Sequence, residues 1–497
     1  MNLALLLFEH PFADDVPLLH TIDRSMTAGA ARAEAHRVAA ELVRELVPPV
    51  RPAVGLDGMA VAVQLPNGPE LVATMVGVWL AGGVYVPVNP RFPDPEVAAV
   101  VAATRPVGLV TPAGIVRLGP GPVESGPAGS GLAGVERRQQ QPEEQQPERY
   151  EPERYEPDVA FVMWTSGTTG PPKPIRHTHD AYVELLDRVL GPLRGGESSG
   201  GSNHERSRRP TPNLIPVSMA LNAGLYNALF GLRAGAALVM MDRFEPHDFA
   251  QLVRRFEIRS TVLPPAAMVS LTDSDLTATD LVPLRYVRSI TAPLSPLHAR
   301  RFVERFGVHV LNGYGQAEMG EVIGWTAADA KDHPDKVGAI GRPHPGVEIR
   351  VDAGDHLWVR PPNTAAGIDD RKDADGFIDT GDLARIDDEG FVWIDGRAGD
   401  VINRGGNKVM PGAVEEVLRL SPAVADVAVV GAPDERLGEV PVAFLVGRPV
   451  PDEDLITLCL AHLVAYKVPS AFHWVDELPR TEVGKVLRQD LVARLTT

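Results

Sequence analysis

The chain has very little cysteine, and this absence removes several classes of site. Cys459 is the single cysteine among 497 residues, so no disulfide can form within the chain and no zinc or iron–sulfur site can be built from several thiolates. The surrounding segment, Leu455–Val464, is rich in apolar residues. We therefore expect Cys459 to be a buried small hydrophobic side chain and not a nucleophile.

Long uninterrupted hydrophobic runs are also missing. The most apolar internal stretch, Leu71–Val88, contains three glycines and Pro87, which indicates a buried helix followed by a strand and not a membrane span. The first residues include only six consecutive apolar positions, with no basic region and no cleavage site of small residues. The sequence therefore predicts a cytoplasmic protein without a secretory signal.

Positive charge is in deficit, with 48 Lys and Arg against 65 Asp and Glu and a formal net charge of −17. Binding of nucleic acid irrespective of its sequence needs a field of Lys and Arg, so nucleic acid is not expected as a partner. Glycine and proline are abundant by contrast, with 47 and 46 residues. This excess predicts many turns together with polar insertions.

Two polar segments interrupt the chain. The first, at about residues 118–157, ends in a tandem ERYEP repeat at 148–152 and 153–157. It has too little apolar surface to offset the entropy of ordering it, so we expect a disordered insertion. The second, Arg194–Pro212, contains four arginines and predicts a tolerated surface loop, with partner docking as the alternative.

Elsewhere the pattern alternates between strands and helices. Ala28–Val47 has the apolar spacing of an amphipathic helix, Met59–Leu65 that of a buried strand, and a helix at Glu70–Trp79 and a strand at Val84–Val88 follow. Similar alternation recurs at residues 249–262, 284–290 and 297–310. This pattern predicts an α/β fold with a largely parallel sheet.

The last third of the chain changes character. After Asp352, short strands separated by Gly and Asp predict a small β-rich subdomain that ends near Gly396 and completes an N-terminal domain of residues 1–396. Residues 397–497 contain a helix at Gly412–Leu420, a helix at Asp452–Leu463 and three short apolar strands. They predict a compact α+β C-terminal domain.

A buried strand at Val159–Met163 leads into the sequence TSGTTGPPK. Between Thr165 and Lys173 lie four hydroxyl side chains, two glycines and the lysine. Glycine lets the backbone approach a ligand closely, and N–H, O–H and ammonium donors suit phosphate oxygens. The spacing does not match the P-loop of nucleoside triphosphatases, and by composition alone a plain turn is nearly as good an interpretation.

Further motifs follow in order: NGYGQAE at 312–318, DTGD at 379–382, Gly396-Arg397, and PRTEVGK at 479–485. With these motifs the chain resembles the adenylate-forming superfamily, which includes acyl- and aryl-CoA synthetases, peptide-synthetase adenylation domains and luciferases. The resemblance covers nearly the whole chain outside the two polar segments. It implies a large α/β domain with a β-rich subdomain and a small mobile α+β C-terminal domain.

The resemblance also implies a nucleotide site. Tyr314 would stack on adenine, Asp382 would accept both ribose hydroxyls with Arg397 beside it, and Glu318 would ligate Mg²⁺ together with the substrate phosphates. The residues that would hold the β- and γ-phosphates of ATP are Thr165, Ser166, Gly167, Thr168, Thr169, Gly170 and Lys173.

By the same resemblance, Lys485 is the main catalytic residue, with Glu318 acting through the metal ion. A lysine at this position would bridge the substrate carboxylate and the α-phosphate and stabilise the charge that builds as pyrophosphate leaves. Asp395–Arg404 would be the hinge of the C-terminal domain, and Gly405 and Gly406 would line the tunnel for the CoA thiol.

The acid would bind among four segments, at residues 216–224, 264–268, 289–292 and 312–313. The residues expected to contact it are Met219, Asn222, Ala292 and Gly313. No acidic residue lies between Leu214 and Met241, so a free α-amino acid is disfavoured. The lining is expected to be apolar and adaptable, which suits a medium acyl or an aryl carboxylate.

Several positions depart from the family pattern, among them the stretch Ser289–Pro293, which stands where a Gly-rich loop beside adenine is usual. Pro174 replaces the usual Gly after the phosphate loop and stiffens its end, and Ala317 replaces the usual Thr before Glu318. Gly399 stands two residues after Arg397, where Asp or Lys is usual, so we expect domain rotation to survive with a less defined resting state.

The sequence therefore predicts an AMP-forming acid–thiol ligase of fatty or aromatic acid metabolism. It would use ATP and Mg²⁺ to convert a carboxylic acid into acyl-AMP, and the CoA thiol would then take the acyl group. One alternative is a stand-alone adenylating enzyme that loads the phosphopantetheine arm of an acyl carrier protein. The other is a degenerate, non-catalytic nucleotide-binding member, which the changes at Pro174 and Ala317 motivate.

Overall fold

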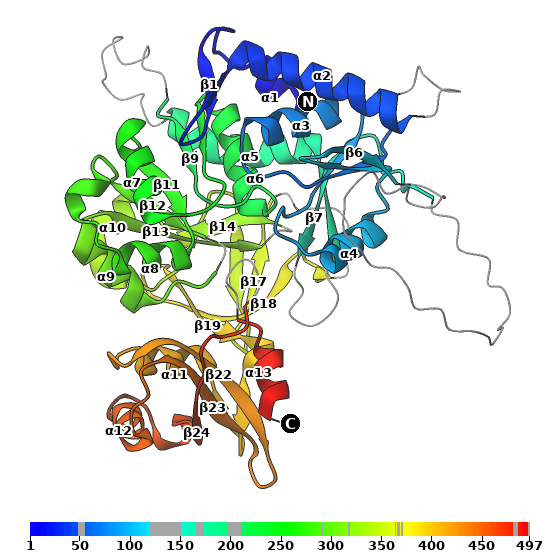
Figure 1. Cartoon of the computed structure of the whole chain (residues 1–497). Coiled ribbons are helices and arrows are strands. Elements are labelled where there is room, and N and C mark those ends of the chain that lie inside the picture. The colour runs from blue at the N-terminus through cyan, green and yellow to red at the C-terminus, as the bar shows by residue number, and fades with distance from the viewer. Residues whose placement is uncertain are drawn as a thin grey trace, which may run out of the picture.

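Two domains of unequal size make up the chain. The computed structural model describes residues 1–47, 55–118, 151–165, 173–195, 210–290, 292–316, 319–362, 364, 368, 371–480 and 486–495. A large N-terminal domain, blue to yellow in Figure 1, lies above a small C-terminal domain in orange and red. The mixed α/β architecture with a large first and a small second domain is confirmed.

One sheet of the large domain has the strand order β6-β5-β3-β4-β7-β8. Its four inner strands are parallel, and β6 and β8 add antiparallel edges. Helices α2 and α3 pack on one face and α4 on the other, so both faces are buried, as continuous apolar strands predict. The bounds are β3 Ala60–Val63, β4 Val84–Pro87, β5 Gly108–Thr111, β6 Gly114–Arg117, β7 Val159–Thr165, β8 Lys173–Thr178, α2 Ala28–Leu46, α3 Pro69–Leu80 and α4 Asp94–Thr104.

Two further sheets complete the α/β part of this domain. One has the order β2-β1-β10-β9 and the other the order β11-β12-β13-β14-β15, with β11, β12 and β13 parallel. Their strands are β1 Pro17–His20, β2 Ser25–Thr27, β9 Asn213–Ile215, β10 Leu238–Met240, β11 Ser260–Leu263, β12 Tyr286–Ser289, β13 His309–Gln316, β14 Gly320–Gly324 and β15 Arg342–Pro343. The accompanying helices are α1 Leu5–Phe8, α5 His179–Gly195, α6 Asn222–Arg233, α7 Pro246–Arg255, α8 Pro265–Asp273, α9 Pro296–Phe306 and α10 Ala327–Asp332.

The predicted β-rich subdomain is an antiparallel sheet with the order β16-β17-β18-β19. Its strands are β16 Glu348–Val351, β17 His356–Arg360, β18 Ile378–Ile386 and β19 Val392–Arg397. The chain then crosses to the C-terminal sheet through the short 3-10 helix η5, Ala398–Asp400. The other 3-10 turns are η2 Ala278–Leu281, η3 Pro334–Lys336 and η6 Ala465–Lys467.

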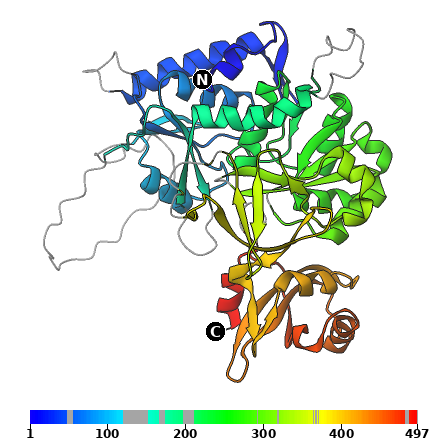
Figure 2. The same ribbon diagram turned by 180° about the vertical axis from the view of Figure 1, so that it is seen from behind.

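The C-terminal domain is one sheet covered by helices on both faces. Helices α11 and α12 pack on one face, and α13 packs on the other, as the view from behind shows (Figure 2). Its elements are β20 Ile402–Arg404, β21 Asn407–Val409, β22 Val424–Asp434, β23 Gly438–Gly447, β24 Ala471–Trp474, α11 Pro411–Leu418, α12 Asp452–His462 and α13 Arg488–Leu495. Cys459 on α12 is fully buried, and burial raises the pKa of its thiol to about 11, so the prediction of a buried small side chain is confirmed.

The expected disorder of the first insertion is wrong at its end. Tyr155, in the second ERYEP repeat, is buried, and its backbone N–H donates to the carbonyl of Gly58 at 3.0 Å. The guanidinium of Arg176 lies 5.2 Å from the centre of the Tyr155 ring. One buried aromatic ring thus orders residues 151–157, whereas residues 119–150 and 196–209 of the two polar segments lie outside the described residues.

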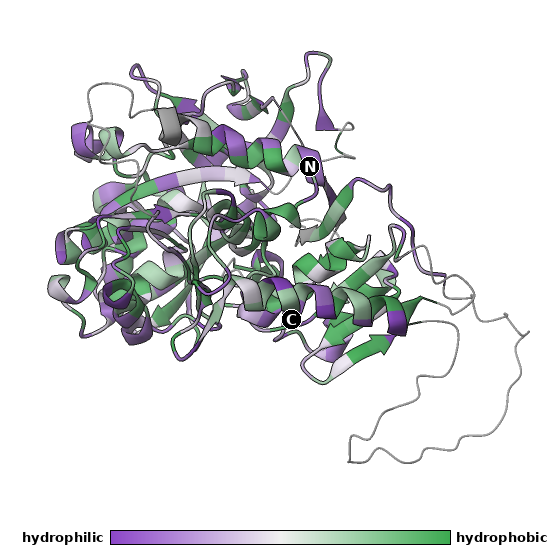
Figure 3. Ribbon diagram, turned by 90° about the horizontal axis from the view of Figure 1, so that it is seen from above, coloured by the Kyte–Doolittle hydropathy of each residue, from purple (hydrophilic) through white to green (hydrophobic). Residues whose placement is uncertain are grey.

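Hydrophobic and hydrophilic residues are interspersed along the helices. Figure 3 shows helices on which hydrophobic and hydrophilic residues alternate along the ribbon. Among the helices that the structure describes, none has the length and apolar composition that crossing a membrane requires.

His177 on β8 provides a pH-dependent contribution to stability. Its ring stacks on Phe161 with centroids 4.7 Å apart, and burial lowers its pKa from 6.5 to about 4. The folded protein therefore keeps this imidazole neutral, while the unfolded chain takes up a proton as the pH falls below about 6.5. The free energy of unfolding therefore decreases as the pH falls from 6.5 to about 4.

We predict that His177→Phe makes the stability less dependent on pH. Urea denaturation at pH 7.5 and pH 5.0 should show that the variant loses about 1–2 kcal/mol less unfolding free energy than the wild type over this interval. His10 and His179, whose pKa values burial also lowers to about 4, remain in both proteins. Equal losses in the two proteins would contradict the assignment.

Candidate functional site

Three of the predicted acid-binding segments meet at one edge of a sheet. The carboxyl ends of β11 and β12 are level with Asn312 in the middle of β13, because Leu263 pairs with Ser289 and Ser289 with Asn312. Strand β9, which leads into the fourth segment, lies beside β11, since the Thr261 hydroxyl donates to the Leu214 carbonyl at 2.8 Å. Ligands of α/β sheets bind outside the carboxyl ends of the strands, so this edge is the candidate site.

Tyr314, Asp382 and Arg397 come together beside this edge. The Tyr314 hydroxyl donates to Oδ2 of Asp382, and Nε of Arg397 lies 2.8 Å from Oδ1. Asp382 and Arg397 face each other directly in the β18–β19 ladder. The carboxylate is only 5% exposed and is held by two donors, so three sequence-predicted residues form one connected group.

The Tyr314 phenol stays protonated in this group. Burial raises its pKa, and the negative charge of Asp382 raises it further. The phenol is therefore a hydrogen-bond donor to Asp382.

The backbone of the DTGD motif is held by neighbours that the sequence analysis missed. Gly381 has φ +71°, and its N–H donates to the Asp379 carboxylate at 2.8 Å. Gln316 donates to the Thr380 carbonyl at 2.8 Å, and Arg371 donates to both the Gln316 side chain and the Asp379 carbonyl at 2.9 Å. Gln316 is part of the NGYGQAE motif, but no signal in the sequence singles out Arg371.

Two of the residues predicted to contact the acid, Met219 and Asn222, lie just before α6 and at its first position. Met219 is fully buried in the core, and its N–H donates to Oδ1 of Asn67 at 2.8 Å. Asn67 in turn donates to the carbonyls of Val217 and Met241, so it shapes this loop, although the sequence analysis missed it. Asn222 starts α6, and its buried Oδ1 has no hydrogen-bond partner among the described residues.

Ala292 lies half-buried between β12 and α9, and Gly313 lies on β13 opposite Gly324 of β14. The carboxylate of Glu321 fills the space beside these glycines. A Cβ on Gly313 would stand 3.0 Å from the Glu321 carboxyl carbon, and one on Gly324 would stand 2.6 Å from its Oε1. The expected apolar lining is therefore wrong at Gly313, because the β13–β14 hairpin folds an acidic residue from outside the four segments onto it.

Glu321 is ionised in this position. It forms an ion pair with Arg288 of β12, and Nε2 of His344 lies 3.0 Å from its Oε1. Burial pushes its pKa up, but the charge of Arg288 and the hydrogen bond of His344 outweigh burial and lower the pKa.

The predicted phosphate loop lies mostly outside the described residues. Its ends are placed, because Thr165 and Lys173 pair across the β7–β8 ladder. Pro174 follows on the edge strand β8, where a missing N–H costs no sheet hydrogen bond to a further strand. Ser166, Gly167, Thr168, Thr169, Gly170, Ala317, Glu318 and Lys485 lie outside the described residues.

The residues predicted to line the thiol tunnel, Gly405 and Gly406, lie in the C-terminal domain. Gly405 and Gly406 form the exposed two-residue turn between β20 and β21, with φ +54° and +87°, a pair of values that glycine adopts without strain. Arg480 and Val486 pair on either side of Lys485. Arg488, at the start of α13, donates to Oε1 of Glu415 at 2.6 Å and lies 3.6 Å from Asp400 of η5.

A side-chain hydrogen bond joins the two domains near the candidate site. The Ser295 hydroxyl, at the start of α9, donates to Oε2 of Glu416 on α11 at 3.1 Å. This contact lies next to the connection from Ala292 to α9, so the small domain rests near the candidate site.

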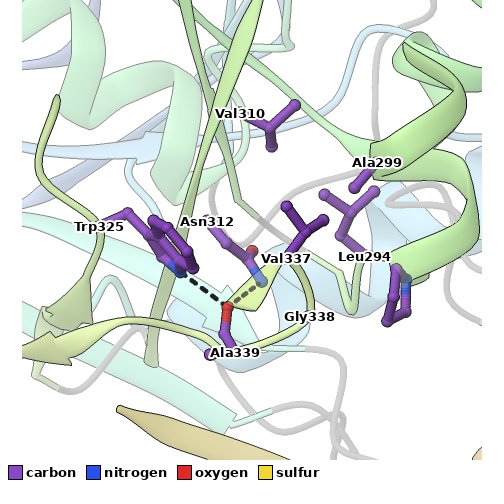
Figure 4. Close-up of a pocket in the computed structure, with 9 residues that line it drawn as sticks. Leu294, Ala299, Val310, Asn312, Trp325, Val337, Gly338 and Ala339 are labelled. Atoms are coloured by element: carbon purple, nitrogen blue, oxygen red, sulfur yellow. Dashed lines mark hydrogen bonds between the residues drawn. The ribbon is translucent and has the colours of Figure 1, made fainter. Parts of the chain in front are cut away.

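A small pocket lies behind β13 (Figure 4). Its lining is mostly apolar, and its polar side chains Asn312 and Trp325 both donate to the Ala339 carbonyl, at 3.3 and 2.8 Å. Since these donors already have an acceptor, we assign the pocket no ligand. The residues that line it are Leu294, Pro296, Ala299, Val310, Asn312, Trp325, Val337, Gly338 and Ala339.

Comparisons with known proteins match this arrangement. The model of the family described as AMP-binding enzyme matches residues 12–367, and that of the AMP-binding enzyme C-terminal domain matches residues 413–485. A CoA ligase of Rhodococcus jostii (strain RHA1), named for a methyl-dioxo-octahydro-indenyl propanoyl group, is 30% identical over 87% of this chain and 88% of its own. 4-Coumarate–CoA ligase 5 of Oryza sativa subsp. japonica is 29% identical over 88% of this chain and 85% of its own.

Solved structures share the fold. ATP-bound MatB from Rhodopseudomonas palustris superposes with a TM-score of 0.77 at 23% identity and covers 99% of this chain and 98% of its own. MenE, the o-succinylbenzoate CoA synthetase from Bacillus subtilis, in complex with its acyl-adenylate intermediate, has a TM-score of 0.76 at 24% identity, with 99% and 97% covered.

The packing around Glu321 predicts the effect of adding one methyl group. Gly324→Ala would push a Cβ against Glu321 and His344, so we expect a loss of about 1–3 kcal/mol of unfolding free energy in urea denaturation. Gly412→Ala on α11 is the control, because its Cβ would meet no atom within 4 Å and Ala favours a helix. A Gly324→Ala protein as stable as the Gly412→Ala protein would show that the carboxylate is not held against β14.

Proposed function

The chain belongs to the AMP-binding enzyme family, and from this membership we infer that it activates a carboxylic acid with ATP and passes the acyl group to the thiol of CoA. It is an AMP-forming acid–thiol ligase, and its cofactors are ATP, Mg²⁺ and CoA. The observation that carries this conclusion is the match to CoA ligases over most of the length of both chains.

The group around Asp382 is the proposed ribose site. Both carboxylate oxygens already accept from donors, Oδ1 from Arg397 and Oδ2 from Tyr314. A ribose hydroxyl is an equivalent donor, so it can take the place of the Tyr314 hydroxyl while Arg397 keeps the carboxylate oriented and ionised. The ring of Tyr314 then offers its face to adenine.

In the first half-reaction, a carboxylate oxygen of the acid attacks the α-phosphorus of ATP. A new oxygen–phosphorus bond forms, the bond to the β-phosphate breaks, and pyrophosphate leaves with its electron pair. We assign the phosphate loop between Thr165 and Lys173 to the β- and γ-phosphates, and Lys485 to the charge that develops at the α-phosphate.

Mg²⁺ at phosphoryl-transfer sites is usually held by one or two carboxylates together with substrate phosphates. Glu318 would supply one such carboxylate, and the bound Mg²⁺ would neutralise phosphate charge.

In the second half-reaction the CoA sulfur attacks the acyl carbon of acyl-AMP, and AMP leaves. We propose that the C-terminal domain, residues 397–497, rotates about Asp395–Arg404 between the two steps and brings the Gly405–Gly406 turn toward the thiol path. Gly399 lies within this hinge in η5, and Arg488 ties α13 to Asp400 at its end, so the segment that carries Lys485 moves as the hinge turns.

The experiment that tests the function is a pyrophosphate-release assay with a panel of alkyl and aryl carboxylic acids, with and without CoA. Release that depends on the acid, together with formation of an acyl-CoA thioester, is expected. Release that CoA never converts into a thioester would favour loading of an acyl carrier protein. Absence of release with every acid, with ATP binding retained, would favour a non-catalytic nucleotide-binding protein.

In the same assay Lys485→Ala should abolish pyrophosphate release, while thioester formation from supplied acyl-AMP stays within a few-fold. Lys331→Ala, which removes an exposed lysine of α10, is the matched control and should leave both half-reactions unchanged. Equal loss of the two half-reactions in Lys485→Ala would contradict the role assigned to this lysine.

The ribose site predicts a separate effect on nucleotide affinity. Asp382→Ala removes a charged acceptor of two hydrogen bonds, so the KM for ATP should rise about 10- to 100-fold, while the KM for the acid changes much less. Asp388→Ala, in the exposed turn that joins β18 to β19, is the control and should leave both constants as they are. A KM for ATP that does not move would place the ribose elsewhere.

A further inference from the structure

Two polar side chains hold the Glu321 carboxylate, and the proposed mechanism uses neither them nor the carboxylate. They come from β12 and from the residue after β15, so only the tertiary fold brings them to Glu321 of β14. We refer to the three residues as the Glu321 cluster, which consists of Arg288, Glu321 and His344.

The Glu321 carboxylate has one engaged and one unengaged oxygen. Arg288 and His344 both contact Oε1, whereas Oε2 has no hydrogen-bond partner within the described part of the chain. The side chain is 18% exposed, so the carboxylate is not sealed in the core. An ionised carboxylate oxygen at a partly open position is a strong acceptor for a donor from a bound molecule.

The cluster lies at the proposed acid site and not at a remote surface. The carboxylate packs against Gly313, which immediately precedes Tyr314 on β13. Ser289, beside Arg288 on β12 and paired with Asn312, is fully buried, and its hydroxyl has no hydrogen-bond partner among the described residues. The polar groups therefore surround the same sheet edge at which the acid is expected to bind.

The cluster thus offers an acceptor at Oε2 of Glu321. A hydrocarbon chain in contact with it would leave this oxygen desolvated and unpaired, which is costly for a buried polar group. A second carboxylate on the substrate would be repelled by Glu321, and an ammonium group would meet the guanidinium group of Arg288 beside it. A neutral hydroxyl can donate to the unengaged oxygen without adding charge.

We propose that the acid activated at this site carries a hydroxyl group at the end remote from its carboxylate, and that Glu321 selects it by accepting its hydrogen bond. The proposal rests on the proposed function and specifies the substrate class for it. Glu321 is a specificity-determining residue, because it contacts the far end of the acid and not the reacting atoms.

Two matched pairs of acids test the selection in the wild-type protein: 3-phenylpropanoic acid with its 4-hydroxyphenyl analogue, and octanoic acid with 8-hydroxyoctanoic acid. In acid-dependent pyrophosphate release, the hydroxylated member of at least one pair should have a kcat/KM at least about tenfold higher than its partner. Equal or lower values in both pairs would overturn the proposal. So would a stronger preference for octanedioic or 8-aminooctanoic acid.

A double substitution tests the role of Glu321. Arg288→Met with Glu321→Met removes the ion pair without leaving a lone buried charge, and it should reduce the hydroxyl preference to within about threefold. Glu348→Met with Arg360→Met removes an exposed ion pair of the same two residue types on β16 and β17 and should keep the full preference. Retention of the preference in the first double variant would overturn the assignment to Glu321.

The single variant Glu321→Gln serves if the double variant does not fold. Gln keeps the size and one oxygen acceptor, so it should show a preference between those of the wild type and the double variant, and an unchanged preference would overturn the assignment. Failure of the proposed function has a different signature: no acid in the set would release pyrophosphate. Efficient release with octanoic and 3-phenylpropanoic acids would overturn only the hydroxyl selection.

Discussion

The hydrogen-bonded carboxylate of Asp382 is the contact on which the site depends. A buried carboxylate is tolerated only when donors surround it, and Tyr314 of one sheet and Arg397 of another supply them. This contact holds the β-rich sheet against β13. The residues proposed to bind adenine and ribose are therefore in position before any nucleotide arrives. The backbone bonds of Gly381, Gln316 and Arg371 stiffen the same corner and reduce the ordering that binding requires.

Glu321 shows the same principle applied to substrate choice. Its carboxylate packs on Gly313 of β13 and Gly324 of β14, where a side chain at either position would crowd it. Arg288 and His344 hold one oxygen, and the other is the acceptor that we assign to the acid. The proposed acid site would thus have a polar end that favours a partner with a hydroxyl over a plain hydrocarbon.

The small domain repeats this use of a buried carboxylate. Glu415 of α11 accepts from the Val429 backbone at 2.9 Å and from Arg488 of α13, and Arg488 also approaches Asp400 in the hinge. The helix that follows Lys485 is thereby fastened to the hinge and to the sheet of its own domain. A hydrogen bond between Ser295 and Glu416 joins this unit to the large domain, and an inter-domain contact of this polar kind is compatible with rotation as a body.

The sequence by itself determined the helices and strands and the order of the functional motifs along the chain. Apolar periodicity predicts the helix Ala28–Val47 and the strands of the parallel sheets to within a few residues, because local side-chain spacing records which face is buried. The motifs, read with the family resemblance, predicted that Tyr314, Asp382 and Arg397 act together. Tertiary structure alone decided that Tyr155 is ordered, that Asn67 and Arg371 brace the site, and that Glu321 lies on Gly313. These contacts join residues far apart in the chain, and no local pattern records which distant charge will find which partner.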